Sequence, residues 1–117
     1  MFEVEFYMKR NGTEPMREHI LSLPDKLQAK VLRSLKLLQL KGSELRYPDT
    51  DDVGDGIFEL RTSFGNDIER ALFFFTEDRR AIITHGFVKK TRRTPPRELR
   101  RAKEYRADYY AQKKEAH

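Results

Sequence analysis

The chain has 117 residues, with 24 lysines and arginines against 19 aspartates and glutamates, and it contains no cysteine. This length fits one domain spanning residues 1–117, because a second core would need on the order of 100 residues of its own. Without cysteine the chain can form neither a disulfide framework nor a thiolate zinc site, and we expect a cytoplasmic protein. The longest apolar run, Ala71 to Phe75, is far shorter than the roughly 20 residues of a membrane span, so we expect no membrane partner.

The N-terminal half of the sequence predicts one strand followed by two helices. Residues Phe2 to Met8 alternate apolar and polar side chains, which is typical of a strand. Apolar residues then recur at helical spacing in two segments, first at Met16, Ile20 and Leu23 and then at Leu27, Val31, Leu35 and Leu38. Gly42 is placed to end the second helix in a left-handed turn. Residues 43–56 contain Pro48, two glycines and four aspartates, and they predict a loop without a strand.

The C-terminal half predicts a meander of three strands and a last helix. The strands are expected at Ile57 to Ser63, Ile68 to Thr76 and Arg80 to Val88. Strict alternation in the third run would place Ala81, Ile83, His85 and Phe87 on one face. The pair Pro95-Pro96 then opens a basic helix. The expected fold is α+β, in the order β-α-α-β-β-β-α: an antiparallel sheet with two N-terminal helices packed on one face and a basic C-terminal helix.

Positive charge is concentrated in the last third of the chain. There are 11 basic and 15 acidic residues up to Asp78, but 13 basic and 4 acidic residues after it. Such a segment is typical of a surface that meets phosphate, although a solvated basic helix would have the same composition. The candidate RNA-binding residues are Arg92, Arg93, Arg97, Arg100 and Arg101.

Four further cations come from three successive β-segments and are the candidate catalytic residues: Arg61, Arg70, Lys89 and Lys90. Arg70 interrupts an apolar run, so it either extends past the core or points into a concave site. We expect the four side chains to converge on one patch exposed to solvent. Cations stabilise the charge that builds on phosphoryl oxygens, and RNA supplies its own 2'-hydroxyl nucleophile. The cluster therefore fits RNA cleavage without a metal better than metal-dependent DNA cleavage, and binding without chemistry fits the same residues.

No metal site is predicted. The aspartates at positions 49 and 51 with Gly54 follow the start of a calcium-loop pattern, but Val53 and Leu60 occupy positions that need oxygen ligands. The three histidines are too far apart in sequence to form a local metal signature.

Several of these motifs together resemble one known family. They are Glu59-Leu60-Arg61, Arg70 in the next run, and His85-Gly86-Phe87-Val88-Lys89-Lys90-Thr91 ahead of Thr94-Pro95 and a basic helix. In this order they are similar to the phage-derived Gp49-like branch of the RelE/HigB toxins of bacterial type II toxin–antitoxin systems. The resemblance implies a RelE-like fold and a toxin that blocks translation by cutting mRNA on the ribosome. It also implies an antitoxin partner, often a helix-turn-helix protein, and no cofactor.

The resemblance points to Arg61, Arg70, Lys89 and Lys90 as the phosphate-facing residues. It assigns no proton-transfer group, because the tyrosine or histidine that many relatives carry after the last strand is absent here. Lys89 or Lys90 could act as the base, and His85 and Tyr105 are candidates for assisting proton transfer.

Two other functions stay open at this stage. One is inhibition of DNA gyrase, as in the related ParE branch. The other is a catalytically degenerate module that binds RNA or antitoxin, which the missing base and the acidic pair Asp51-Asp52 would favour.

Overall fold

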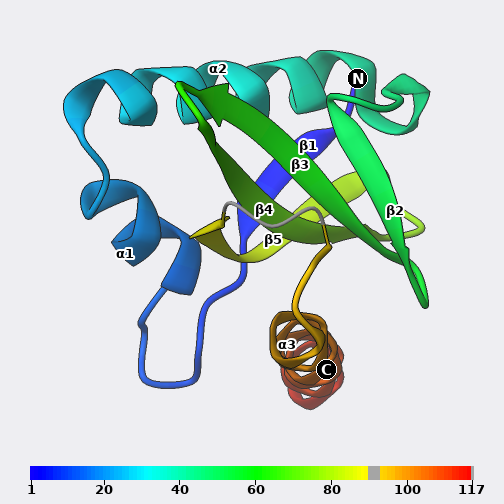
Figure 1. Cartoon of the computed structure of the whole chain (residues 1–117). Coiled ribbons are helices and arrows are strands. Elements are labelled where there is room, and N and C mark those ends of the chain that lie inside the picture. Colours follow the sequence, from blue (N-terminus) through cyan, green and yellow to red (C-terminus); the bar gives the residue numbers. More distant parts are fainter. Residues whose placement is uncertain (90–92, 117) are drawn as a thin grey trace.

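Five strands form a single sheet in the order β1-β5-β4-β3-β2, with helices on both faces (Figure 1). The computed structural model describes residues 1–89 and 93–116, and of Lys89 it describes the backbone alone. The elements in chain order are β1 (Glu3–Phe6), α1 (Pro15–Leu21), α2 (Asp25–Lys41), the short 3-10 helix η1 (Gly42–Glu44), β2 (Thr50–Gly54), β3 (Ile57–Phe64), β4 (Asp67–Phe75), β5 (Arg80–Lys89) and α3 (Pro96–Glu115). The α+β class, the two N-terminal helices on one face and the basic C-terminal helix are thereby confirmed.

Two hydrophobic layers hold the sheet between its helices. On one face, Val31 and Leu38 of α2 pack with Met16 of α1 against Leu60 and Phe73 of the sheet. On the other face, α3 contributes Ala102 and Tyr109 to a cluster with Leu72, Phe74 and Ile82. The central strand β4 alternates between the two layers, which explains why both of its faces are apolar in sequence.

Gly42 ends α2 as predicted, and its missing side chain has a packing reason. Its φ of 53° lies in the left-handed region, where glycine carries no steric penalty. A Cβ at this position would lie 2.0 Å from a ring carbon of Phe2. Gly42 therefore ends the helix and lets the N-terminus cross it closely.

Two details of the predicted sheet were wrong. The sheet is mixed rather than antiparallel, because β1 pairs with β5 in parallel, from Glu3 opposite Arg80 to Phe6 opposite Ile83. The segment expected to be a loop contains β2, which pairs antiparallel with β3. Its aspartates gave no strand pattern, because an edge strand needs only one covered side and its partner supplies the hydrogen bonds.

A β-bulge in β5 overturns the predicted alternation of the last strand. Phe73 pairs with Ile83 but Leu72 pairs with His85, so Thr84 is an extra residue opposite β4. The Thr84 hydroxyl donates to the Leu72 carbonyl at 3.1 Å. Ile83 consequently faces the α1 and α2 layer, whereas His85 faces α3 and reaches Glu98 of that helix.

None of the helices in the described parts of the chain combines the length and the hydropathy that crossing a membrane requires.

Candidate functional site

Arg61 and Arg70 lie side by side on the α3 face of the sheet. They are direct partners in the antiparallel register of β3 and β4, so their side chains leave the same face. Glu59 is two residues before Arg61 on β3 and shares this face. The register thus brings together the two predicted catalytic arginines, and Glu59 adds a carboxylate beside them.

The Glu59 carboxylate links both arginines to the segment that leads into α3. Its Oε1 accepts a hydrogen bond from Arg61 Nη1 at 2.8 Å, and its Oε2 lies 3.8 Å from Arg70 Nη1. The Thr94 hydroxyl donates to Oε2 at 2.5 Å. Glu59 is only 1% exposed, so its charge acts on these partners with little screening by water. The sequence motif Glu59-Leu60-Arg61 contained this residue, but a period-two pattern alone does not show that α3 covers its face.

The expectation of one solvent-exposed cationic patch was wrong for Arg70. Arg70 is 1% exposed, because it shares its face of the central strand with Leu72 and Phe74 beneath α3. The Arg61 side chain keeps 11% exposure and lies 5.3 Å from the ring of Tyr47, which is 68% exposed. Arg61 is therefore the member of the pair that a ligand can touch, and Arg70 supports it from within the protein.

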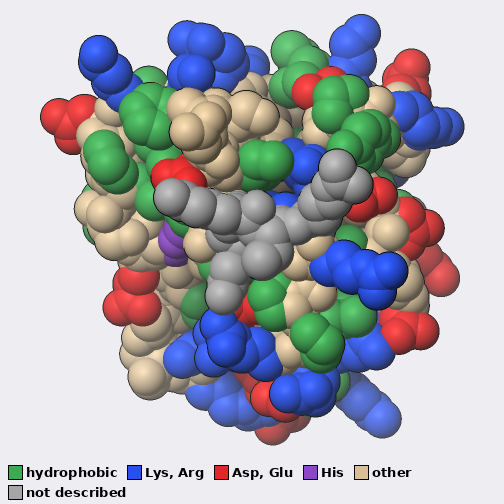
Figure 2. Space-filling view, viewed as in Figure 1, with side chains coloured by type: hydrophobic (Ala, Val, Ile, Leu, Met, Phe, Trp, Pro, Cys, Tyr) green, Lys and Arg blue, Asp and Glu red, His purple; other side chains and the backbone are tan. Residues whose placement is uncertain are grey.

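Four of the candidate RNA-binding residues lie at or just before the start of α3. Arg93, Arg97, Arg100 and Arg101 are all exposed. Lysine and arginine side chains gather over α3 in the lower part of the same face of the molecule (Figure 2). Lys90, Arg92 and the side chain of Lys89 lie outside the described residues.

A small cavity of about 260 Å³ opens beside Thr94, where β2 meets the start of α3. Arg93 and Leu99 line one side, and Asp51 and Val53 of β2 line the other. Asp51 and Arg93 thus border the same cavity. The negative charge of β2 faces the cationic region here instead of lying in a remote loop.

His85, a candidate for proton transfer, is buried under α3. Its Nδ1 lies 3.1 Å from the Thr84 hydroxyl, and its Nε2 lies 3.1 Å from Glu98 Oε1. Burial lowers the pKa of His85, although Glu98 opposes that effect. Both ring nitrogens therefore face protein groups, which argues against direct contact between His85 and a substrate.

Tyr105, the second proton-transfer candidate, lies in an aromatic stack on the same face. Its ring stacks on Tyr7 at 4.7 Å and meets His85 edge-on at 5.7 Å. The Tyr7 hydroxyl donates to Asp108 at 2.6 Å, which ties the residue directly after β1 to α3. This packing holds the Tyr105 ring of α3 against His85 of the sheet.

A second histidine–carboxylate pair, which the sequence did not reveal, lies on the opposite face, with the carboxylate buried and the histidine partly exposed. His19 Nε2 of α1 is 2.9 Å from Glu69 Oε2 of β4. Burial raises the pKa of Glu69, and the hydrogen bond from His19 only partly offsets that effect. Gly86 makes room for the pair, since a Cβ there would lie 2.4 Å from His19 Cδ2. The only sequence signal for this arrangement is a glycine inside a strand.

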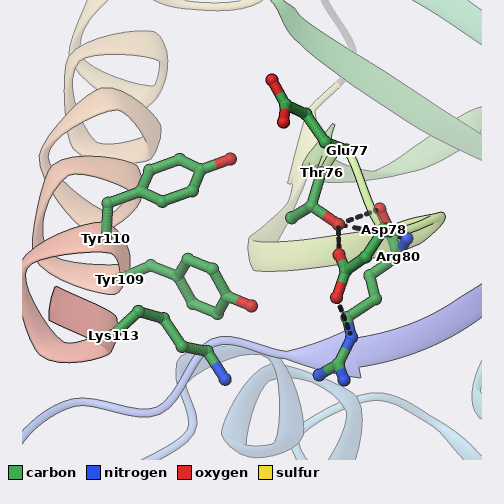
Figure 3. A pocket seen from close by; sticks show the side chains of 7 residues that line it. All are labelled: Thr76, Glu77, Asp78, Arg80, Tyr109, Tyr110 and Lys113. Carbon is green, nitrogen blue, oxygen red and sulfur yellow. Dashed lines mark hydrogen bonds and ion pairs between the residues drawn. The ribbon is translucent and has the colours of Figure 1, made fainter. Parts of the chain in front are cut away.

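A cavity of about 690 Å³ lies far along α3 from the start of that helix, against the turn between β4 and β5 (Figure 3). Tyr109, Tyr110 and Lys113 line it from α3, opposite Asp78 and Arg80. Arg80 Nε pairs with Asp78 at 3.1 Å, so this cation is already neutralised. The cavity carries both signs of charge and suits a phosphate less well than the surface around Arg61. Within residues 1–89 and 93–116, no three His, Cys, Asp or Glu side chains are grouped so that they could hold a metal ion.

The sequence matches one family model, that of "Phage derived protein Gp49-like (DUF891)", over residues 18–107. This match covers more than half of the chain and includes α2, all strands except β1, and the first half of α3. No curated protein matches the sequence. The family is associated with the toxins of toxin–antitoxin systems. The chain therefore belongs to the phage-derived Gp49-like family.

Proposed function

We propose that the protein is a RelE/HigB-type toxin that acts in the cytoplasm as a single domain, cuts mRNA on the ribosome and is held silent by an antitoxin. The family match supports a toxin. The observation that carries the nuclease proposal is the Arg61–Arg70 pair, joined through Glu59 and Thr94 to the start of a basic helix. Arginine side chains arranged in this way can bind the phosphodiester of RNA.

Arg61 is proposed to contact the scissile phosphate. Its Nη1 donates to Glu59, and a guanidinium has further N–H donors that can bind a phosphate oxygen at the same time. Arg70 is proposed as a positioning residue, because its buried charge holds Glu59 and through it orients Arg61. Lys89 and Lys90 are proposed to complete the phosphate-facing group. Arg92, Arg93, Arg97, Arg100 and Arg101 are proposed to bind the RNA backbone on either side.

In the proposed reaction the 2'-oxygen of the RNA attacks the adjacent phosphorus. The new bond to phosphorus forms as the bond to the 5'-oxygen breaks, which leaves a 2',3'-cyclic phosphate and a 5'-hydroxyl. The proton of the 2'-hydroxyl passes to a base, proposed to be Lys89 or Lys90 in its neutral form, and the 5'-oxygen gains a proton. Arg61 stabilises the additional negative charge on the phosphoryl oxygens. His85 and Tyr105 are proposed to act through the packing of α3, since His85 is buried.

The test compares Arg61→Gln with Arg33→Gln. Arg33 is an exposed arginine of α2 on the other side of the sheet, so its substitution makes the same change of net charge away from the site. The wild-type protein and Arg33→Gln should arrest growth and produce new mRNA ends in a translation mixture, as detected by toeprinting. Arg61→Gln should reduce cleavage at least about a hundredfold, which is the usual loss when one charge-stabilising donor is removed. Equal cleavage by both variants would refute the site.

Glu59 offsets one of the two positive charges of the arginine pair, which favours a second candidate function, a module that binds RNA or antitoxin without cleaving. Toeprinting separates the two candidates. A module of this kind would bind the ribosome or RNA in a salt-dependent manner but would produce no cuts, and Arg61→Gln would then weaken binding alone.

A further inference from the structure

Within the described residues, β2 forms an edge of the sheet that no further strand covers. Among the described residues, β3 is the only strand that pairs with it. The Arg61 N–H donates to the Asp49 carbonyl at 2.9 Å, so the backbone groups of Asp49 point toward β3. Because these directions alternate along a strand, Asp51 also faces β3, and Asp52 turns its N–H and carbonyl outward. An open edge of this kind can accept a further strand from another chain.

An apolar pocket lies directly beside this edge. Its volume is about 350 Å³, and it lies between η1 and the sheet on the α2 side. Aromatic and aliphatic side chains form its inner wall, namely Leu45, Phe58, Phe73 and Phe75. The largely exposed ring of Tyr47 and the backbone of Asp52 border its mouth. The pocket has room for one large aliphatic side chain that enters from a strand laid along β2.

The charge around the edge is negative. Asp49 and Asp52 are exposed, and Asp51 is half-buried on the same strand or next to it. Arg46 is the cation at the pocket, and its Nη1 donates to the carbonyl groups of Ser43 and Leu45. The aspartates would repel an RNA backbone, whereas they attract lysine or arginine side chains. The combination of an open backbone edge, an apolar pocket and acidic side chains therefore describes a protein segment rather than a nucleic acid.

We propose that β2 is the docking site for an extended, basic segment of a partner protein. The segment pairs with the outer edge of β2, places one large aliphatic side chain among Phe58, Phe73 and Phe75, and presents its lysines or arginines to the aspartates of the strand. The pocket lies on the α2 side of the sheet, Asp51 is shared with the cavity beside Arg93, and the site does not use Arg61 or Arg70 as contacts. This inference stands independently of the proposed nuclease activity. If the protein is a toxin, an antitoxin segment of this chemistry is the expected occupant.

The probe is a short synthetic peptide in which lysine alternates with valine around a central leucine, so that all apolar side chains share one face of a strand. Its binding to the purified full chain is followed by amide chemical shifts in NMR spectra, which detect millimolar affinity. The expected result is a set of shifts confined to β2, β3 and the residues around the pocket. Replacing the central leucine with alanine should weaken binding about tenfold or more, because the pocket then loses a buried aliphatic side chain. Methylating alternate backbone amides of the peptide should abolish binding, because strand pairing needs their N–H groups.

Two variants at one position separate the backbone edge from its charge. Asp52→Pro removes an outward N–H without removing a β2–β3 hydrogen bond and should weaken peptide binding about tenfold. Asp52→Asn keeps this backbone N–H, and its amide oxygen can still accept the 2.9 Å hydrogen bond from the Gly54 N–H. It removes only the negative charge, so it should weaken peptide binding a few-fold and mainly at low salt. Both variants must keep the wild-type shifts outside β2 and β3. Absence of peptide shifts at β2 in the wild type, or equal binding by the methylated peptide, would overturn the proposal. Neither outcome bears on the nuclease proposal, which the toeprinting of Arg61→Gln tests separately.

Discussion

Substituting Glu59 with glutamine tests whether its carboxylate holds the arginine pair together. Glutamine keeps the shape of the side chain and one acceptor oxygen, but it removes the negative charge that faces Arg61 and Arg70 at 2.8 and 3.8 Å. Breaking a buried ion pair by removing one partner costs about 3–5 kcal/mol. Since the amide oxygen can still accept from Thr94 or Arg61, we expect a loss at the low end, about 3 kcal/mol of the free energy of unfolding.

The assay is urea unfolding of the purified protein, with a thermal melt as a second measurement. A loss of 3 kcal/mol corresponds to a fall in Tm on the order of 10 °C for a domain of this size. The control is Glu104→Gln, which neutralises an exposed glutamate of α3 and should change stability by less than about 0.5 kcal/mol. An unchanged dependence of unfolding on urea in both variants shows that the comparison concerns the native state.

A double-mutant cycle with Arg70→Met assigns the loss to the ion pair. Methionine fills much of the arginine volume without a charge, so the double variant no longer contains a buried cation next to a neutral residue 59. We expect the double variant to lose at least about 1 kcal/mol less than the sum of the two single losses. Additive losses, or a loss below about 1 kcal/mol for Glu59→Gln alone, would refute the view that Glu59 organises the site.

Three further substitutions test packing and buried charge elsewhere. Burial raises the pKa of Glu69, so the native state holds a proton that the unfolded state has already released, and the wild type loses stability as the pH rises above the ordinary glutamate value. The stability of Glu69→Gln relative to the wild type, measured by urea unfolding, should therefore increase from pH 4 to pH 7. A constant difference between the two proteins would contradict this. Gly42→Ala should cost about 2 kcal/mol in the same assay, and the additional change Phe2→Ala should recover part of it; no recovery would show that the close approach is not the cause. Gly86→Ala should cost a similar amount through its 2.4 Å approach to His19, and a shift of the His19 ring signals in NMR should accompany it; an unperturbed ring would contradict the contact.

The helices and the central strands followed from sequence because burial alone decides their pattern. In α2 the buried residues Leu27, Val31, Leu35 and Leu38 repeat at the helical period, and the helix ends at the predicted glycine. In β3, Phe58 and Leu60 face the α2 layer as the alternation predicts. Such positions make the same contact at every turn or every second residue, so the local pattern carries the tertiary information.

The features that sequence reasoning missed depend on contacts between distant segments. The strand β2 forms because β3 offers it a partner, and its own aspartates favour a loop. The bulge at Thr84 reverses the side-chain directions of β5 halfway along, which no alternation pattern can show. The predicted alternation thus placed His85 on the same face as Ala81 and Ile83, whereas it lies on the opposite face. Its burial against Glu98 became visible only once α3 was docked on the sheet.

The different burial of the two arginines determines how the candidate site can work. Arg70 and Glu59 are each 1% exposed, so their charges compensate each other inside the protein and add little to the field in solvent. Arg61 lies between this buried pair and the surface, and the negative charge of Glu59 at its Nη1 lowers the attraction of the guanidinium for an approaching phosphate. Removing the charge of Glu59 therefore weakens the fold and at the same time leaves Arg61 more attractive to an anion. Stability and phosphate affinity should change in opposite directions in Glu59→Gln, whereas a merely structural ion pair would change stability alone.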